Sequence, residues 1–78
     1  MNVEKYKSVI KKVKENGMRC IDKEKRKDKK NEWKPYISAK LSGITDTIVY
    51  DEDIDFDGKE ELMSEIRKAE TEIWDYVI

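Results

Sequence analysis

Two segments of the chain repeat their apolar residues at intervals of three and four, the spacing that places side chains on one face of a helix. The first segment starts after Asn2, an acceptable N-cap, and ends at Asn16-Gly17, a pair typical of helix termini. The second starts with Asp57 as N-cap and Glu60 three residues later, a capping-box arrangement. The apolar positions of the two predicted helices are Val3, Tyr6, Val9, Ile10 and Val13, and Leu62, Ile66, Ala69, Ile73 and Val77.

The segment between these helices has features of β-strands. Apolar and polar residues alternate over 33–41, a period typical of a half-buried strand, and Pro35 near its beginning fits an edge position. Residues 44–50 are rich in β-branched side chains, and residues 18–22 alternate in part. Residues 23–30 contain no apolar residue, which favours a solvated turn or an extended hairpin tip.

The predicted architecture is a small two-layer α+β domain of αβββα order, with a two- to three-stranded antiparallel sheet between an N-terminal and a C-terminal helix. A length of 78 residues favours a single domain spanning residues 1–78. Burial alone stabilises so small a domain only marginally, so a homodimer through Trp33 or Trp74 is one expectation. The predicted core consists of Val3, Tyr6, Ile10, Val13, Cys20, Ile37, Ala39, Leu41, Ile48, Tyr50, Phe56, Leu62, Ile66, Ala69 and Ile73.

The composition excludes several kinds of chemistry. The chain has no histidine and one cysteine, Cys20, which rules out zinc fingers, histidine-based acid–base catalysis and an internal disulfide. The abundant carboxylates lie in polar surroundings that give no reason for a raised pKa, so we expect no enzyme, no catalytic residue and no cofactor. No long apolar run is present, and we expect no membrane partner and a cytoplasmic location.

The near-neutral total charge of −1 hides a segregation of charge along the chain. Residues 1–41 carry 14 Lys and Arg against 6 Asp and Glu, whereas residues 42–78 carry 3 against 12. The halves therefore sum to +8 and −9. Such asymmetry points to contact with a polyanion or to mimicry of one, unless the two halves neutralise each other within the fold.

The acidic half contains a run of alternate aspartates between residues 51 and 57. In an extended strand they would form a row of carboxylates about 6.6–6.8 Å apart, a scale similar to neighbouring phosphates of a nucleic-acid strand. Such a surface could compete for a site built to bind a polyanion; the alternative is that the charges only protect an edge strand from aggregation. The predicted partner-binding residues are Asp51, Glu52, Asp53, Asp55, Asp57, Glu61 and Glu65.

In size, composition and this carboxylate row, the chain resembles small charge-rich accessory proteins of phages and mobile elements, such as anti-CRISPR and anti-restriction proteins. The resemblance implies a non-enzymatic inhibitor that binds a nucleic-acid-handling protein.

Two alternatives use other residues. Asp53, Asp55, Asp57 and Gly58 match the first half of an EF-hand calcium loop, although Ser64 stands where the last bidentate glutamate is needed. Cations and aromatics also combine in residues 23–36, and a basic hairpin of this kind could bind nucleic acid. The residues of this second alternative are Lys23, Lys25, Arg26, Lys27, Lys29, Lys30, Trp33, Lys34 and Tyr36.

Overall fold

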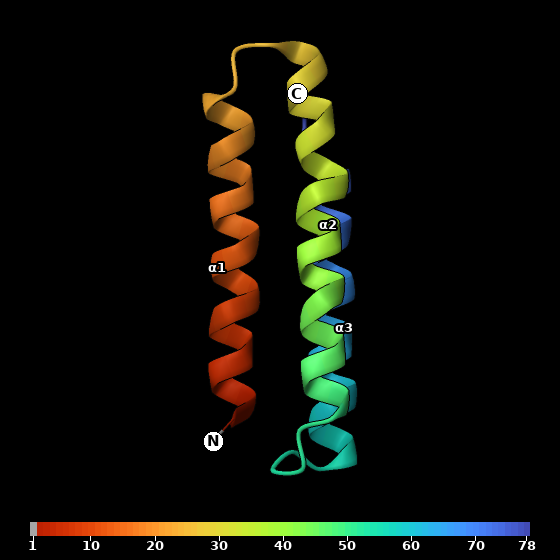
Figure 1. Ribbon diagram of the computed structural model, residues 1–78. Coiled ribbons are helices and arrows are strands. Elements are labelled where there is room, and N and C mark those ends of the chain that lie inside the picture. The colour runs from red at the N-terminus through yellow and green to blue at the C-terminus, as the bar shows by residue number, and fades with distance from the viewer. Residues whose placement is uncertain (1) are drawn as a thin grey trace.

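Three helices arranged up, down and up make an elongated bundle of 43 × 16 × 16 Å (Figure 1). The computed structural model describes residues 2–78 and places α1 at Asn2–Lys23, α2 at Lys27–Val49 and α3 at Phe56–Trp74. Each helix contacts both of the others. Short connections therefore lie at the two ends of the bundle: residues 24–26 at one end, and residues 50–55 beside the start of α1 at the other.

The predicted α+β fold is wrong, because residues 2–78 contain helices and no strand. Residues 18–22 continue α1, and residues 33–41 and 44–49 belong to α2. The β-branched residues of this region are helical because tertiary packing overrides local propensity. The apolar residues of α2 follow at intervals of four, four, three and four, which is helical spacing; they are Trp33, Ile37, Leu41, Ile44 and Ile48.

Gly17 lies inside α1 and does not end it. No residue in the described part of the chain has a positive φ, so Gly17 is not the left-handed terminator that the sequence suggested. Gly17 is buried, and a Cβ built on it would lie 2.6–2.9 Å from three side-chain atoms of Ile37. The missing side chain lets the backbone of α1 approach α2 closely, and α1 continues past this contact to bury Ile21.

Pro35, expected at a strand edge, lies in the interior of α2 on an exposed position. Proline has no N–H to donate to the carbonyl of Asn31 one turn earlier, and its ring crowds that carbonyl. The helix nevertheless continues on both sides of Pro35, because Trp33 and Ile37 pack against or within the core.

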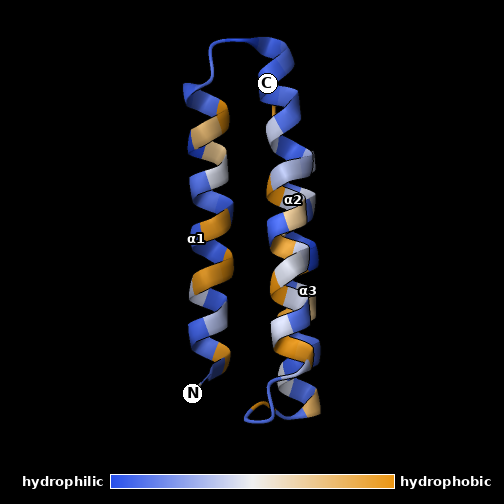
Figure 2. Cartoon of the chain, in the orientation of Figure 1, coloured by the Kyte–Doolittle hydropathy of each residue, from blue (hydrophilic) through white to orange (hydrophobic). Residues whose placement is uncertain are grey.

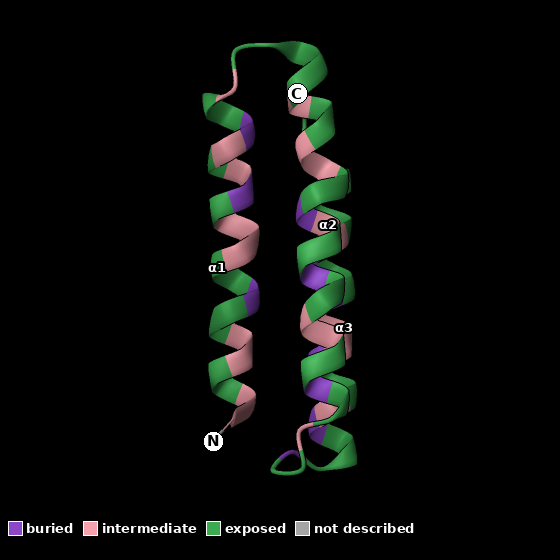
Figure 3. Cartoon of the chain, in the orientation of Figure 1, coloured by how far each residue is buried: buried purple, intermediate pink, exposed green. Residues whose placement is uncertain are grey.

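The core is a column of aliphatic side chains along the centre of the bundle. Figures 2 and 3 colour the ribbons by the hydropathy and by the burial of each residue. Among the described residues, no polar or charged residue is buried with it. Its buried residues are Ile10, Ile21, Ile37, Leu41, Ile48, Ile54, Leu62, Ile66, Ala69 and Ile73.

The predicted core is confirmed at most of its positions and wrong at three. Tyr50 is 82% exposed, Phe56 is 72% exposed, and Ala39 lies on the solvent side of α2. All three were assigned inward positions on strands, whereas Ala39 lies on the outer side of α2, Tyr50 follows its last residue and Phe56 begins α3. Cys20 is half-buried.

Lysines from neighbouring helices bind the carboxyl ends of all three helices. Lys30 donates to the carbonyl of Ile21 at the end of α1 (2.8 Å), and Lys59 donates to the carbonyl of Val49 at the end of α2 (2.8 Å). Lys34 donates to the carbonyls of Trp74 and Tyr76 at the end of α3 (2.9 and 2.7 Å). Helices α2 and α3 have no basic residue in their own last turns, so these lysines supply the positive charge that the helix dipoles favour.

Gly17 and Gly43, in the interiors of α1 and α2, make a matched test of the α1–α2 contact. An added methyl group meets Ile37 at Gly17, whereas nothing lies within 4 Å of one at Gly43. Both Gly→Ala changes gain helix propensity of about 1 kcal/mol, but overpacking of about 1–3 kcal/mol affects only Gly17→Ala. We therefore expect Gly43→Ala to be the more stable of the two variants by about 1–3 kcal/mol in urea denaturation followed by circular dichroism. Equal stabilities would contradict the close approach.

Pro35 gives a second test. Replacing an exposed proline inside a helix by alanine restores one backbone hydrogen bond and removes a clash, so Pro35→Ala should raise the free energy of unfolding by about 1–3 kcal/mol. Denaturation of the variant beside the natural chain measures this. An unchanged or lower stability would mean that the segment is not a continuous helix.

Candidate partner-binding surface

The segment expected to form a row of carboxylates is a compact turn. Residues 50–55 join α2 to α3, and Asp51 organises the turn: its carbonyl accepts from the N–H of Ile54 (3.4 Å) and its carboxylate from the N–H of Asp53 (2.9 Å). Ile54 is buried and holds the turn against the core. The aspartates therefore do not lie at the regular spacing of an extended strand, and that part of the prediction is wrong.

Two of the predicted partner-binding aspartates have structural roles. The Asp51 carboxylate accepts hydrogen bonds from the Tyr6 hydroxyl (3.0 Å) and the Asn2 amide (3.4 Å), which ties the turn to α1. The Asp55 carboxylate is the N-cap of α3 and accepts from the N–H of Gly58 (2.8 Å). The N-cap expected at Asp57 is thus two residues earlier.

Two predicted glutamates of α3 form ion pairs. Glu61 binds Lys7 of α1 at 2.6 Å, and Glu65 lies 4.0 Å from Lys68 on its own helix. Further along the same pair of helices, Lys14 of α1 binds Glu72 of α3 at 2.6 Å. The basic first half and the acidic last part of the chain therefore face each other along α1 and α3, and part of the charge asymmetry is neutralised inside the fold.

Four exposed carboxylates with unengaged side chains remain within residues 52–60, and we call them the acidic end: Glu52, Asp53, Asp57 and Glu60. Within residues 2–78, no ion pair or side-chain hydrogen bond involves any of them. These side chains can therefore be used by a partner without loss of an internal contact. Three of the four belong to the predicted set.

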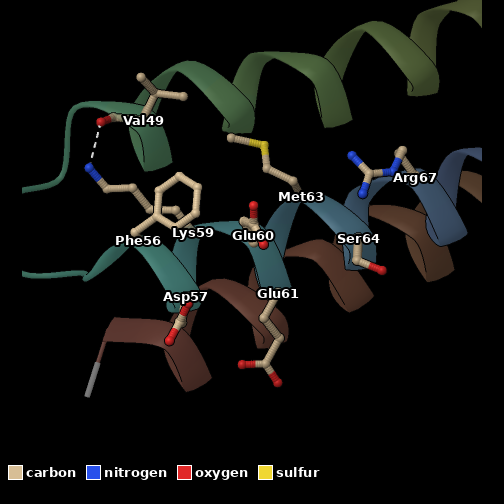
Figure 4. A pocket seen from close by; sticks show the side chains of 9 residues that line it. All are labelled: Val49, Phe56, Asp57, Lys59, Glu60, Glu61, Met63, Ser64 and Arg67. Atoms are coloured by element: carbon tan, nitrogen blue, oxygen red, sulfur yellow. Dashed lines mark hydrogen bonds between the residues drawn. The ribbon is translucent and has the colours of Figure 1, made fainter.

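Exposed aromatic rings flank the acidic end. Tyr50 ends α2 and Phe56 begins α3, and both rings are largely in solvent. A surface groove of about 820 Å³ runs between the end of α2 and the first turns of α3. Figure 4 shows Val49, Phe56 and Met63 in this groove, with Asp57 and Glu61 directed away from α2. The groove thus combines apolar side chains with charges of both signs, because Lys59 and Arg67 line it together with Asp57, Glu60 and Glu61.

The exposure of Tyr50 and Phe56 was not predicted, although their positions outside the apolar stripes indicate it. The stripe of α2 ends at Ile48 and that of α3 begins at Leu62, so both aromatics fall outside the three- and four-residue spacing. Large apolar residues outside the stripes of a small bundle have no core to enter, and where they gather into one patch they indicate a contact surface.

The predicted basic hairpin of residues 23–36 does not form. Lys23 ends α1, residues 24–26 make the connection, and α2 begins at Lys27. Within this segment Lys30 and Lys34 are engaged by carbonyls at helix ends, whereas Trp33 and Tyr36 meet edge to face with ring centroids 5.6 Å apart.

The calcium-loop residues are divided between two structures. Asp55 caps α3 and is engaged by Gly58, while Asp53 lies in the turn and Asp57 in the first turn of the helix. No group of three or more Cys, Asp or Glu side chains in the described residues is arranged to hold a metal ion.

Comparison with known proteins gives no match to a protein family, to a curated protein or to a solved structure. None of the three helices is both long and apolar enough to cross a membrane.

The hydroxyls of Tyr6 and Tyr76 donate hydrogen bonds to carboxylates in other parts of the chain, and their pKa values predict how stability changes at alkaline pH. Burial, together with the hydrogen bond to Asp51, raises the pKa of Tyr6 above its ordinary value of about 10. The hydrogen bond to Asp22 (2.7 Å) and burial raise the pKa of Tyr76 in the same direction. Groups with raised pKa values stabilise the fold fully below their unfolded pKa, and this stabilisation is lost as pH rises through the folded value.

We therefore expect the free energy of unfolding to fall as the pH rises above about 10. A variant carrying Tyr6→Phe and Tyr76→Phe should be less stable near neutral pH and show a smaller fall at alkaline pH. Urea denaturation at a series of pH values measures both. The same alkaline decline in the variant would show that these phenols do not carry it.

Proposed function

We propose that this protein is a non-enzymatic interaction module whose acidic end docks onto a cationic surface of a protein partner, a site that otherwise binds nucleic acid. The module would act as an inhibitor in the manner of phage or mobile-element accessory proteins, such as anti-CRISPR or anti-restriction proteins. The location proposed for this activity is the cytoplasm, where the single cysteine would stay reduced.

The observation that carries the proposal is the pairing of unengaged carboxylates with exposed aromatic rings. The carboxylates of Glu52, Asp53 and Asp57 have no partner among the described residues, and the exposed Tyr50 and Phe56 are close to them in the sequence. Aromatic side chains supply most of the binding energy in many interfaces, while charges at the rim select the partner and speed its approach. The unpaired carboxylates of the acidic end favour a partner surface rich in lysine and arginine.

A non-enzymatic role is supported by the chemistry of the polar side chains. None of those described is buried, so no carboxylate lies in an apolar pocket that would tune it for proton transfer.

Triple neutralisation tests the proposal: Glu52→Gln, Asp53→Asn and Asp57→Asn in one chain. These residues are exposed, so the variant should keep the fold. Its charge complementarity to the partner and the salt dependence of partner binding should be lost. The measurement is capture from nuclease-treated host lysate, followed by a competition assay. We expect the natural chain to retain a protein that the neutralised variant does not retain. In the competition assay, adding the natural chain should displace nucleic acid from that protein.

Glu15→Gln, Glu70→Gln and Asp75→Asn together make the charge control, because they remove the same charge from the middle and the opposite end of the bundle. Glu70→Gln keeps an oxygen that can accept from the Ser42 hydroxyl. The control should capture the partner as the natural chain does. Phe56→Ala should weaken capture by about tenfold or more while leaving thermal stability nearly unchanged, as expected of an exposed anchor residue. Equal retention by the neutralised variant would contradict the proposal.

A further inference from the structure

One outer face of α2 carries a second set of exposed groups, far from the acidic end. Lys29, Trp33, Tyr36 and Lys40 follow at intervals of four, three and four, so they lie on the same face of the helix. We call this set the aromatic–lysine stripe. At a rise of about 1.5 Å per residue it extends over roughly 16 Å of helix.

The two rings of the stripe differ in exposure. Trp33 is half-buried and packs against the core, whereas Tyr36 is 53% exposed. The core contact fixes Trp33, and Trp33 in turn meets Tyr36 edge to face at an interplanar angle of 75°. A concavity of about 280 Å³ borders both rings and Lys29, and Glu24 and Glu32 complete its lining. The rings thus form a supported aromatic surface at which a flat ligand can stack.

Cations accompany these rings. The Lys40 ammonium lies 5.0 Å from the centre of the Tyr36 ring, and residues 23–40 contain eight Lys and Arg against three Asp and Glu. Lys29 is paired with Glu32 at 3.3 Å, but both side chains are largely exposed. An exposed ion pair of this kind contributes little to stability, so an incoming phosphate can replace the Glu32 carboxylate beside the Lys29 ammonium.

We propose that the aromatic–lysine stripe of α2 binds single-stranded nucleic acid, with bases stacked at Trp33 and Tyr36 and phosphates bound by Lys29 and Lys40. Single strands expose the faces of their bases, whereas a duplex keeps them stacked inside. A single strand presents a flat base beside every phosphate, whereas the carboxylates of an acidic protein have no flat group regularly beside them. The stripe therefore fits a single strand better than either alternative.

This site differs from the basic hairpin that the sequence suggested. Lys30 and Lys34 are engaged by carbonyls at the ends of α1 and α3, and Lys40, four residues beyond the predicted segment, takes part instead. The stripe also shares no residue with the acidic end, so either site can fail while the other stands.

Fluorescence anisotropy with a labelled 20-nucleotide oligothymidylate tests the proposal, with oligouridylate and a 20-base-pair duplex as further arms. We expect both single strands to bind more tightly than the duplex, and a difference between them to identify DNA or RNA as the preferred source. Tyr36→Ala should weaken binding by about tenfold or more, because it removes one stacked base. In a Trp74→Phe chain, where Trp33 is the single tryptophan, the oligonucleotide should quench the tryptophan emission.

Salt dependence tests the two lysines. In a chain with Lys29→Gln and Lys40→Gln, the slope of log affinity against log salt should decrease by about 1.4, the value for two phosphate contacts to a single strand. The matched control carries Lys5→Gln and Lys12→Gln, which remove two exposed lysines from α1, and should bind within about twofold of the natural chain.

Three results would overturn the inference. The first is no binding of either single strand at low salt. The second is Tyr36→Ala binding as the natural chain does, with polyphosphate or polyglutamate competing as well as the oligonucleotide; that would show a basic patch that recognises charge alone. The third is equal loss of affinity in the stripe and control lysine variants.

Discussion

The fold depends on the contact of three narrow aliphatic stripes along one axis. Only 37% of the residues are hydrophobic, so each helix can supply one stripe and little else. The buried residues are almost all Ile and Leu. Together with Gly17 and the half-buried residues that pack against them, they form stripes with intervals of three and four in α1, α2 and α3. Gly17 lets α1 approach closely enough for Ile37 to enter the core. Up-down-up packing with short connections follows from this pattern.

Charge is distributed around that core in three ways. Along α1 and α3, lysines and glutamates bind each other and join the two helices. At the helix ends, lysines from adjacent helices donate to free carbonyls. The remaining charge lies on the surface, with unengaged carboxylates around residues 52–60 and excess cations around residues 23–40. The opposite charges of the two chain halves thus contribute both to internal contacts and to separate surfaces at different ends of one rod.

The sequence allowed α3 and the beginning of α1 to be predicted, because their stripes have helical spacing over their whole length. It misled in α2, where Ile37, Ala39 and Leu41 alternate as a strand would. Over so short a stretch, apolar residues with the period of a strand cannot be told from those with the period of a helix. Only the longer series of apolar residues from Trp33 to Ile48 distinguishes the two. Gly17 added to the error as a usual sign of a helix end, and Pro35 did so because it was interpreted as a residue of a strand edge.

The candidate site was predictable in composition and not in geometry. Three of the four unengaged carboxylates were expected, but the spacing in sequence could not show that Asp51 and Asp55 would be engaged in the turn. The engagement of the Asp51 side chain depends in part on Tyr6, which α1 places beside Asp51 although the two residues are 45 positions apart in the sequence. The exposure of Phe56 likewise follows from the position at which α3 begins.

The central claim is that residues 27–49 form one helix whose apolar stripe packs against α1 at Gly17. Nuclear magnetic resonance of the full chain tests it most directly, through Cα secondary shifts and contacts of the Ile37 methyl groups. The account predicts helical shifts throughout residues 27–49 and a nuclear Overhauser effect between Ile37 methyl protons and the Gly17 α-protons. Strand-type shifts over residues 37–50, with cross-strand contacts and no Gly17–Ile37 effect, would contradict it.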